Sequence, residues 1–179
     1  MNAVETNRPR PSAATLAALR GLQEILDTQS EGYRRLLSTI ERQREAVRTA
    51  DLALVPEIAE VQRKIVERLA VLDGRREVAG RALATEMGID PESGVSAIAA
   101  LLPIAAADRL EVRAAELRGL VEQARREQSL LKSAGEALAK HMAGIVQSVT
   151  GALSGTGVYG RRGRLREGAP LVAGLDLTS

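Results

Sequence analysis

Residues 110–153 read LEVRAAELRGLVEQARREQSLLKSAGEALAKHMAGIVQSVTGAL, without a proline. Apolar side chains recur in this segment every three or four residues, which is the spacing of a coiled-coil seam. At 1.5 Å per residue the helix is about 65 Å long. A single apolar seam has to be covered, so we expect the rest of the chain to pack against this helix. The seam positions are Leu110, Ala114, Leu117, Val121, Ala124, Gln128, Leu131, Gly135, Leu138, Met142, Ile145 and Val149.

A second heptad pattern lies near the start of the chain. Ser12 or Thr15 can cap the N-terminus of the helix that it predicts. The pattern breaks at Ala50 and Asp51, and this break ends the helix. Its seam contains Leu19, Leu22, Leu26, Tyr33, Leu36, Ile40 and Val47.

A third pattern predicts a helix that begins near Leu54, with Pro56 in its first turn, where a missing backbone N–H costs nothing. Gly88 ends this helix as a left-handed cap. The break between the first two helices is short, and this favours an antiparallel hairpin. A short helix over 96–102, ended by Pro103, then brings the chain back across the end of the hairpin to the last long helix.

These patterns predict an all-α fold, an elongated antiparallel helical bundle or coiled coil of three long helices with a short connecting helix and a flexible C-terminal tail. We expect a disordered leader over 1–12, the bundle over 13–153 and a flexible basic and apolar tail over 154–179.

The composition excludes several classes of protein. The 179 residues contain no Cys, no Phe, no Trp and two Tyr. Without cysteine there is no disulfide scaffold, thiolate catalysis or Cys-ligated metal site. The start lacks the apolar core of a secretory signal, and no apolar run is long enough for a bilayer. We therefore expect a cytoplasmic protein with no stable membrane insertion.

The charge of the chain lies at its ends. The net charge is +2; residues 161–179 hold four arginines against two acids, and residues 1–12 hold two arginines against one acid. The remaining body is therefore nearly neutral, at −1. This distribution argues against a nucleic-acid-binding face on the bundle.

No motif supports catalysis or a cofactor. Gly155, Gly157 and Gly160 spell G-x-G-x-x-G, but a dinucleotide site needs a strand before this motif and a helix after it. His141 is the only histidine and has no clustered carboxylates beside it for a metal site. We predict neither an enzyme, a cofactor nor a metal.

The end of the chain carries Tyr159 and the arginines 161, 162, 164 and 166. An isolated tyrosine in a glycine-rich, basic segment has no core to support, which favours a role in recognition. The arginines are compatible with a solubilising tail, with phosphate binding or with protein binding.

The predicted elements follow one another in a characteristic order. Two heptad helices are separated by a break reading ADLAL at 50–54, and a Gly-Ile turn at Gly88 follows them. A third long helix and the terminal TGVYGRRG at 156–163 complete the order. This arrangement resembles the FlgN-type flagellar export chaperones over residues 15–163. The resemblance implies a cytosolic chaperone that binds the C-terminal helices of flagellar hook-filament junction proteins, prevents their premature assembly and delivers them to the export gate of the type III apparatus.

On this interpretation, the C-terminal half of the last helix binds the client. A partly open seam can accept an amphipathic helix, and the flexible Met142 side chain adapts to different clients. The expected client-binding residues are Leu138, Met142, Ile145, Val149 and Leu153. The residues expected to contact the export gate are Val158, Tyr159, Arg161 and Arg162. The alternative is a self-associating structural coiled coil with a basic tethering tail.

Overall fold

The computed structural model describes residues 11–155, with side chains described through residue 151. This part of the chain forms four helices and no strand: α1 (Ala13–Arg48), α2 (Leu54–Glu86), α3 (Val95–Leu101) and α4 (Ile104–Gly155). The predicted all-α fold with three long helices and one short connecting helix is confirmed. The chain divides into two compact units, residues 1–132 and residues 133–179.

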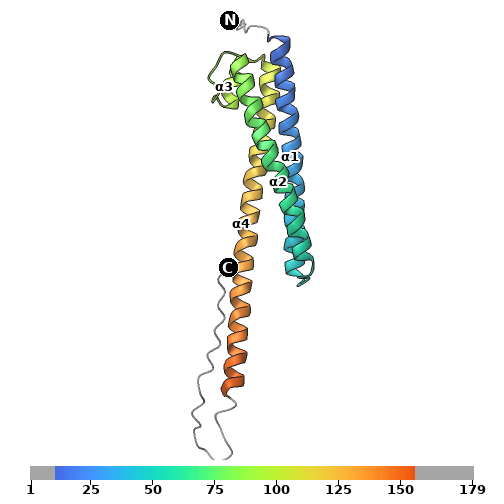
Figure 1. The fold of residues 1–179 in the computed structure, drawn as a ribbon, viewed down its shortest axis with the longest axis vertical. Helices are drawn as coiled ribbons and strands as arrows, with labels where there is room; N and C mark the ends of the chain where they lie inside the picture. Colours follow the sequence, from blue (N-terminus) through green and yellow to red (C-terminus); the bar gives the residue numbers. More distant parts are fainter. Residues whose placement is uncertain (1–10, 156–179) are drawn as a thin grey trace, which may run out of the picture. The chain divides into compact units, whose positions relative to one another are not determined.

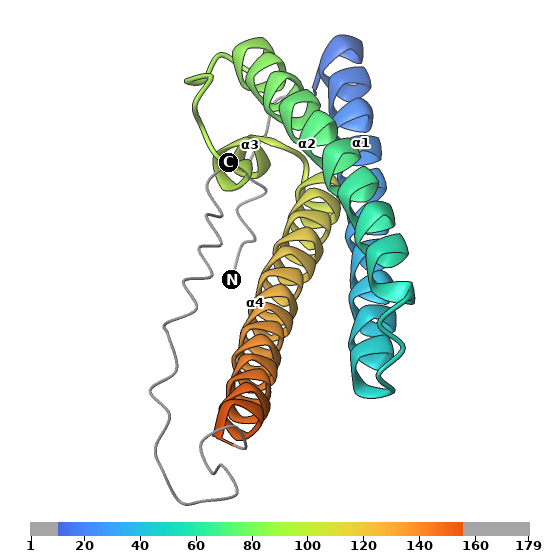
Figure 2. The same ribbon diagram turned by 60° about the horizontal axis from the view of Figure 1, so that its bottom comes forward.

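The first unit begins with a capped hairpin. The Ser12 side chain accepts a hydrogen bond from the Thr15 backbone N–H at 2.9 Å, which satisfies one of the free donors at the start of α1. α1 and α2 lie side by side in opposite directions (Figure 1, Figure 2). α2 begins at Leu54 with Pro56 in its first turn and ends just before Gly88, whose φ is +72°. Both ends of α2 agree with those predicted from the sequence.

α3 and the start of α4 close the end of the hairpin where α1 begins and α2 ends. Ile98 and Leu102 are almost completely buried, together with Leu22 of α1, Leu83 of α2 and Leu110 of α4. A second core cluster holds Leu36, Ile40, Leu69 and Ala124. The apolar seams of α1, α2 and the first part of α4 therefore meet in one bundle, as their heptad spacing predicts.

α4 starts six residues earlier than the predicted 110–153. The Pro103 carbonyl accepts hydrogen bonds from the backbone N–H groups of Ala106 and Ala107, at 2.8 and 2.9 Å. Pro103 therefore ends α3 and also provides the first acceptor of α4. The sequence interpretation assigns Pro103 only to the end of the short helix and misses its second role at the start of α4.

Three ion pairs hold α4 against α1 within the first unit. Arg113 donates to Asp27 at 2.9 Å, and the pairs Arg34–Glu116 and Arg44–Glu127 follow along the two helices. The numbers rise together in all three pairs, so α4 runs parallel to α1 and antiparallel to α2.

Candidate protein-interaction site

The seam of α4 changes from buried to exposed along its length. Leu110, Leu117 and Ala124 are buried, and Leu131 is half-buried. Every described seam position from Gly135 onward is exposed. One continuous heptad pattern thus serves as core in the first unit and as surface in the second.

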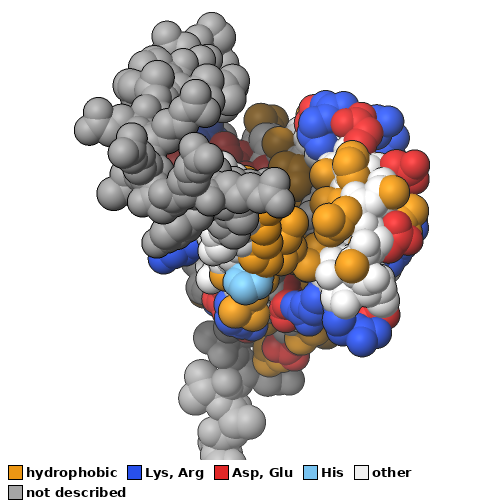
Figure 3. All heavy atoms as spheres, turned by 90° about the horizontal axis from the view of Figure 1, so that it is seen from below, with side chains coloured by type: hydrophobic (Ala, Val, Ile, Leu, Met, Phe, Trp, Pro, Cys, Tyr) orange, Lys and Arg blue, Asp and Glu red, His pale blue; other side chains and the backbone are white. Residues whose placement is uncertain are grey.

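The exposed part forms an apolar stripe on the second unit. Steps of four, three and four residues place its first four members on one face of the helix. The stripe consists of Leu138 (40% exposed), Met142 (54%), Ile145 (45%), Val149 (52%) and the adjacent Val146 (61%). Figure 3 shows hydrophobic side chains exposed beside the imidazole of His141, the only histidine of the chain.

Val146 was missed by the sequence interpretation because it is not a seam position. It lies four residues after Met142 and three before Val149, so it is their neighbour on the helix surface. This spacing could have identified it. Val146 widens the stripe beyond the narrow edge that a strict heptad gives.

The hydroxyl groups near the stripe are already occupied within the helix. Ser148 Oγ donates to the Gly144 carbonyl at 2.9 Å, and Thr150 Oγ1 donates to the Val146 carbonyl at 2.8 Å. These bonds leave apolar contact as the principal interaction that the stripe offers to a partner.

The predicted client-binding residues Leu138, Met142, Ile145 and Val149 are thus brought together on one exposed face of α4. Leu153 belongs to the same helix, but its side chain lies outside the described residues. The predicted gate-contacting residues Val158, Tyr159, Arg161 and Arg162 also lie outside them.

The described residues contain no group of three or more His, Asp or Glu side chains placed to hold a metal ion. Within the same part of the chain, no helix combines the length and the apolarity needed to cross a bilayer.

Comparisons with known proteins identify the family. Searches among curated proteins and among solved structures each found no match. A family model described as FlgN protein matches residues 18–167, which cover most of the chain. The match includes most of α1, all of α2, α3 and α4, and the residues around Tyr159. The chain therefore belongs to the FlgN family, a family of flagellar export chaperones.

Proposed function

We propose that this protein is a cytoplasmic chaperone that binds the C-terminal helices of hook-filament junction proteins, keeps these proteins unassembled and delivers them to the flagellar export gate. Membership of the FlgN family supports the chaperone role. The clients, the delivery step and the compartment are our proposal.

The observation that carries the proposal is the apolar stripe, defined above as Leu138, Met142, Ile145, Val146 and Val149. An amphipathic client helix that packs on it removes apolar surface of both helices from water. Burying the exposed half of one such side chain contributes about 1 kcal/mol, half of the value for complete burial. A charge placed in the stripe opposes binding further, because it has to be desolvated.

The test is co-expression with a hook-filament junction protein, followed by copurification. We expect a soluble complex with the unchanged chain and no complex with the double variant Met142→Asp, Ile145→Asp. The matched control is Val71→Asp, Val78→Asp, which places two charges on exposed valines of α2 and should leave the complex intact. Equal loss of the complex in both double variants would contradict the proposed site.

The same stripe could instead pair with the stripe of a second copy, as in the structural coiled-coil alternative. Light scattering separates the two cases. For a client-binding chaperone, whose stripe stays available, we expect light scattering to detect no dimer that forms through the stripe. A stable dimer that Met142→Asp, Ile145→Asp converts to monomer would favour the structural coiled coil.

For the gate contact we propose Val158, Tyr159, Arg161 and Arg162. A tyrosine beside arginines is a typical anchor of a protein interface. We expect Tyr159→Ala to reduce export of the client while the copurified complex is unchanged. Equal loss of export and of client capture would contradict this division of roles.

A further inference from the structure

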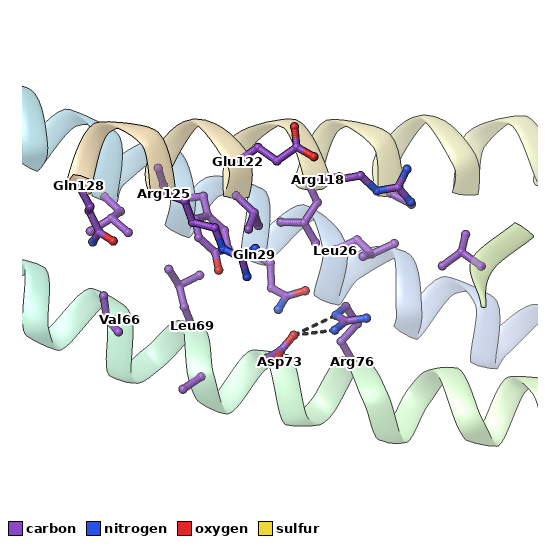
Figure 4. Close-up of a pocket in the computed structure, with 18 residues that line it drawn as sticks. Leu26, Gln29, Val66, Leu69, Asp73, Arg76, Arg118, Glu122, Arg125 and Gln128 are labelled. Atoms are coloured by element: carbon purple, nitrogen blue, oxygen red, sulfur yellow. Dashed lines mark hydrogen bonds and ion pairs between the residues drawn. The ribbon is translucent and has the colours of Figure 1, made fainter. Parts of the chain in front are cut away.

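The first unit contains a groove that the proposed function does not use. It lies between α2 and α4, with α1 at its back, and has a volume of about 620 Å³. Figure 4 shows Val66 and Leu69 of α2 facing α4 across it. Leu117 and Val121 contribute apolar surface from the α4 wall. Apolar walls of this kind suit the side chains of an amphipathic segment.

A buried amide at the back of the groove lacks a hydrogen-bond partner. Gln29 of α1 is 2% exposed, and its Oε1 accepts no hydrogen bond from any residue that the structure describes. Figure 4 shows its side chain between the two walls. Buried amide oxygens are nearly always paired, so an unpaired one needs an explanation. A donor from a bound partner would supply the missing bond.

The charges of α4 differ between its two sides. On the side of α1, Arg113, Glu116 and Glu127 all form ion pairs with α1. On the groove side, Arg118 and Arg125 form no ion pair with the described residues.

The other charged residues of the groove do not form ion pairs with these two arginines. Glu122 lies on α4 between the two arginines, and Arg76 on the α2 wall is paired with Asp73 at 2.7 Å. The five charged residues that line the groove therefore have a net charge of +1, with two arginines available to acidic side chains.

We propose that this groove is a second docking site, which binds an acidic amphipathic helix of another protein. The apolar face of the helix packs against Val66 and Val121, and a side-chain amide or hydroxyl donates to Gln29 Oε1. Carboxylates on its flank pair with Arg118 and Arg125. The lining residues of α4 extend from Ala114 to Gln128, about 21 Å of helix, which matches a partner helix of about four turns. This site is separate from the stripe and does not depend on the proposed function.

The probe is a dye-labelled peptide of four helical turns with leucines on one face, an asparagine at their centre and glutamates on the flanks. Its binding to the full chain is measured by fluorescence anisotropy. We expect saturable binding, and a peptide with lysines in place of the glutamates should bind at least about tenfold more weakly, the difference that two rim ion pairs can produce.

Reversing the charge of the two groove arginines tests whether the peptide binds in the groove. Arg118→Glu with Arg125→Glu should weaken the acidic peptide at least about tenfold and should favour the lysine peptide. The matched control is Arg109→Glu with Arg126→Glu, which makes the same change of charge at exposed α4 positions outside the groove, and it should leave binding unchanged. Equal effects of the two double variants would overturn the proposal, because they would indicate attraction by total charge alone.

Two further variants test the contacts. The unchanged protein should bind the asparagine peptide more tightly than the same peptide with alanine in place of the asparagine. The Gln29→Leu variant should bind the two peptides equally. A preserved preference in this variant would overturn the role of Gln29. Met142→Asp with Ile145→Asp should leave peptide binding unchanged; loss of binding in this variant would place the peptide on the stripe and overturn the groove site. A concentration-dependent dimer that disappears in Arg118→Glu, Arg125→Glu would also overturn the proposal, because a second copy would then occupy the groove.

Discussion

Ala50, in the turn between α1 and α2, has a φ of +57°, in the left-handed region that favours glycine. Its backbone N–H donates to the Val47 carbonyl, and the N–H of Asp51 donates to the Ala46 carbonyl at 2.9 Å. These two bonds form a Schellman cap, in which glycine usually occupies the position of Ala50.

We expect Ala50→Gly to raise the free energy of unfolding by about 1 kcal/mol, because it removes the left-handed strain of an alanine. Ala59→Gly is the matched control. Ala59 is an exposed residue inside α2, so glycine there adds chain entropy to the unfolded state and should lower stability by about 0.5–1 kcal/mol. Urea unfolding of the two variants measures both changes. A gain of stability in neither variant would contradict the strain at Ala50.

Gly32 lies where α1 and α2 approach closely. A Cβ at this position would be 2.7 Å from Leu69 Cδ2, whereas a Cβ at Gly119 would have nothing within 4 Å. Gly119→Ala should therefore raise the free energy of unfolding by about 0.8–1 kcal/mol through helix propensity. Gly32→Ala gains the same propensity but displaces the buried Leu69, at a cost of about 1–3 kcal/mol. We expect a net loss of about 1 kcal/mol in urea unfolding, and equal gains in the two variants would contradict the close approach.

The sequence analysis does not single out Gln29, although this residue lies in the heptad series of α1. The positions 22, 29, 36 and 43 are seven residues apart, and Leu22 and Leu36 were assigned to the seam. Gln29 and Gln43 were left out because they are polar. Both have an unpartnered buried Oε1 among the described residues. The heptad spacing predicts that both glutamines are buried, but their polar side chains argue against a place in an apolar seam.

At the scale of the element, α2 carries a chain of charged residues on its surface. Arg63 donates to Glu60 at 2.7 and 2.8 Å and also pairs with Glu67. The hydrogen bond from Arg63, with a smaller contribution from Lys64, lowers the pKa of Glu60 to about 2. Because the pKa is lower in the folded chain, the carboxylate stabilises α2 above about pH 4.5, and this contribution is lost as the pH falls toward 2.

An NMR titration of the Glu60 carboxyl carbon should therefore give a midpoint near 2 in the unchanged chain. In Arg63→Gln the midpoint should move back toward the ordinary value of 4.5, because the main hydrogen bond is gone. Arg68→Gln, an exposed arginine of the same helix, is the control and should not move it. A midpoint near 4.5 in the unchanged chain would contradict the proposed cause.

The two parts of α4 should differ in hydrogen exchange. Backbone amides over 104–131 belong to the packed bundle, whereas those over 133–151 belong to a helix whose described side chains are all exposed. Amide protection depends on local unfolding, which is easier where few apolar contacts hold a helix. We expect slow exchange in the first part and fast exchange in the second, measured by mass spectrometry of peptides. Uniform protection along α4 would contradict this difference.

Helix boundaries were predictable where proline or glycine fixes the backbone. Pro56 placed the start of α2, and Gly88 placed its end. The start of α4 was missed because its first turn consists of Ile104 and three alanines, without a capping side chain. In that turn the acceptor is the Pro103 carbonyl, a backbone group that side-chain patterns do not reveal.

One heptad pattern serves as core in one unit of the chain and as surface in the other. Leu110 is 0% exposed and Leu138 is 40% exposed, although both occupy the same heptad position of the same helix. Leu110→Ala should lower the free energy of unfolding by about 2–5 kcal/mol, since it leaves a cavity in the core. Leu138→Ala should lower it by less than about 1 kcal/mol. Similar losses in urea unfolding would mean that Leu138 is also part of a core.

The heptad pattern predicts the position of this stripe, whereas its partial exposure is expected only from the resemblance to export chaperones. Leucine at a heptad position has the same sequence signature in a core and on a surface. The lengths of the helices indicate part of this exposure, because α4 has 52 residues while α1 has 36 and α2 has 33. The two shorter helices cannot cover α4 along its whole length. Exposure itself follows from tertiary packing, and therefore only the structure could separate Leu110 from Leu138.

Gly135, Gly144 and Gly151 all lie in the exposed part of α4, with nothing within 4 Å of where a Cβ would stand. Each weakens the helix by about 0.8–1 kcal/mol relative to alanine. A ligand that docks here therefore has to stabilise a helix of low intrinsic propensity, and this cost lowers the affinity of the complex. Weaker binding suits the proposed delivery role, in which the chaperone releases each client and then binds the next one.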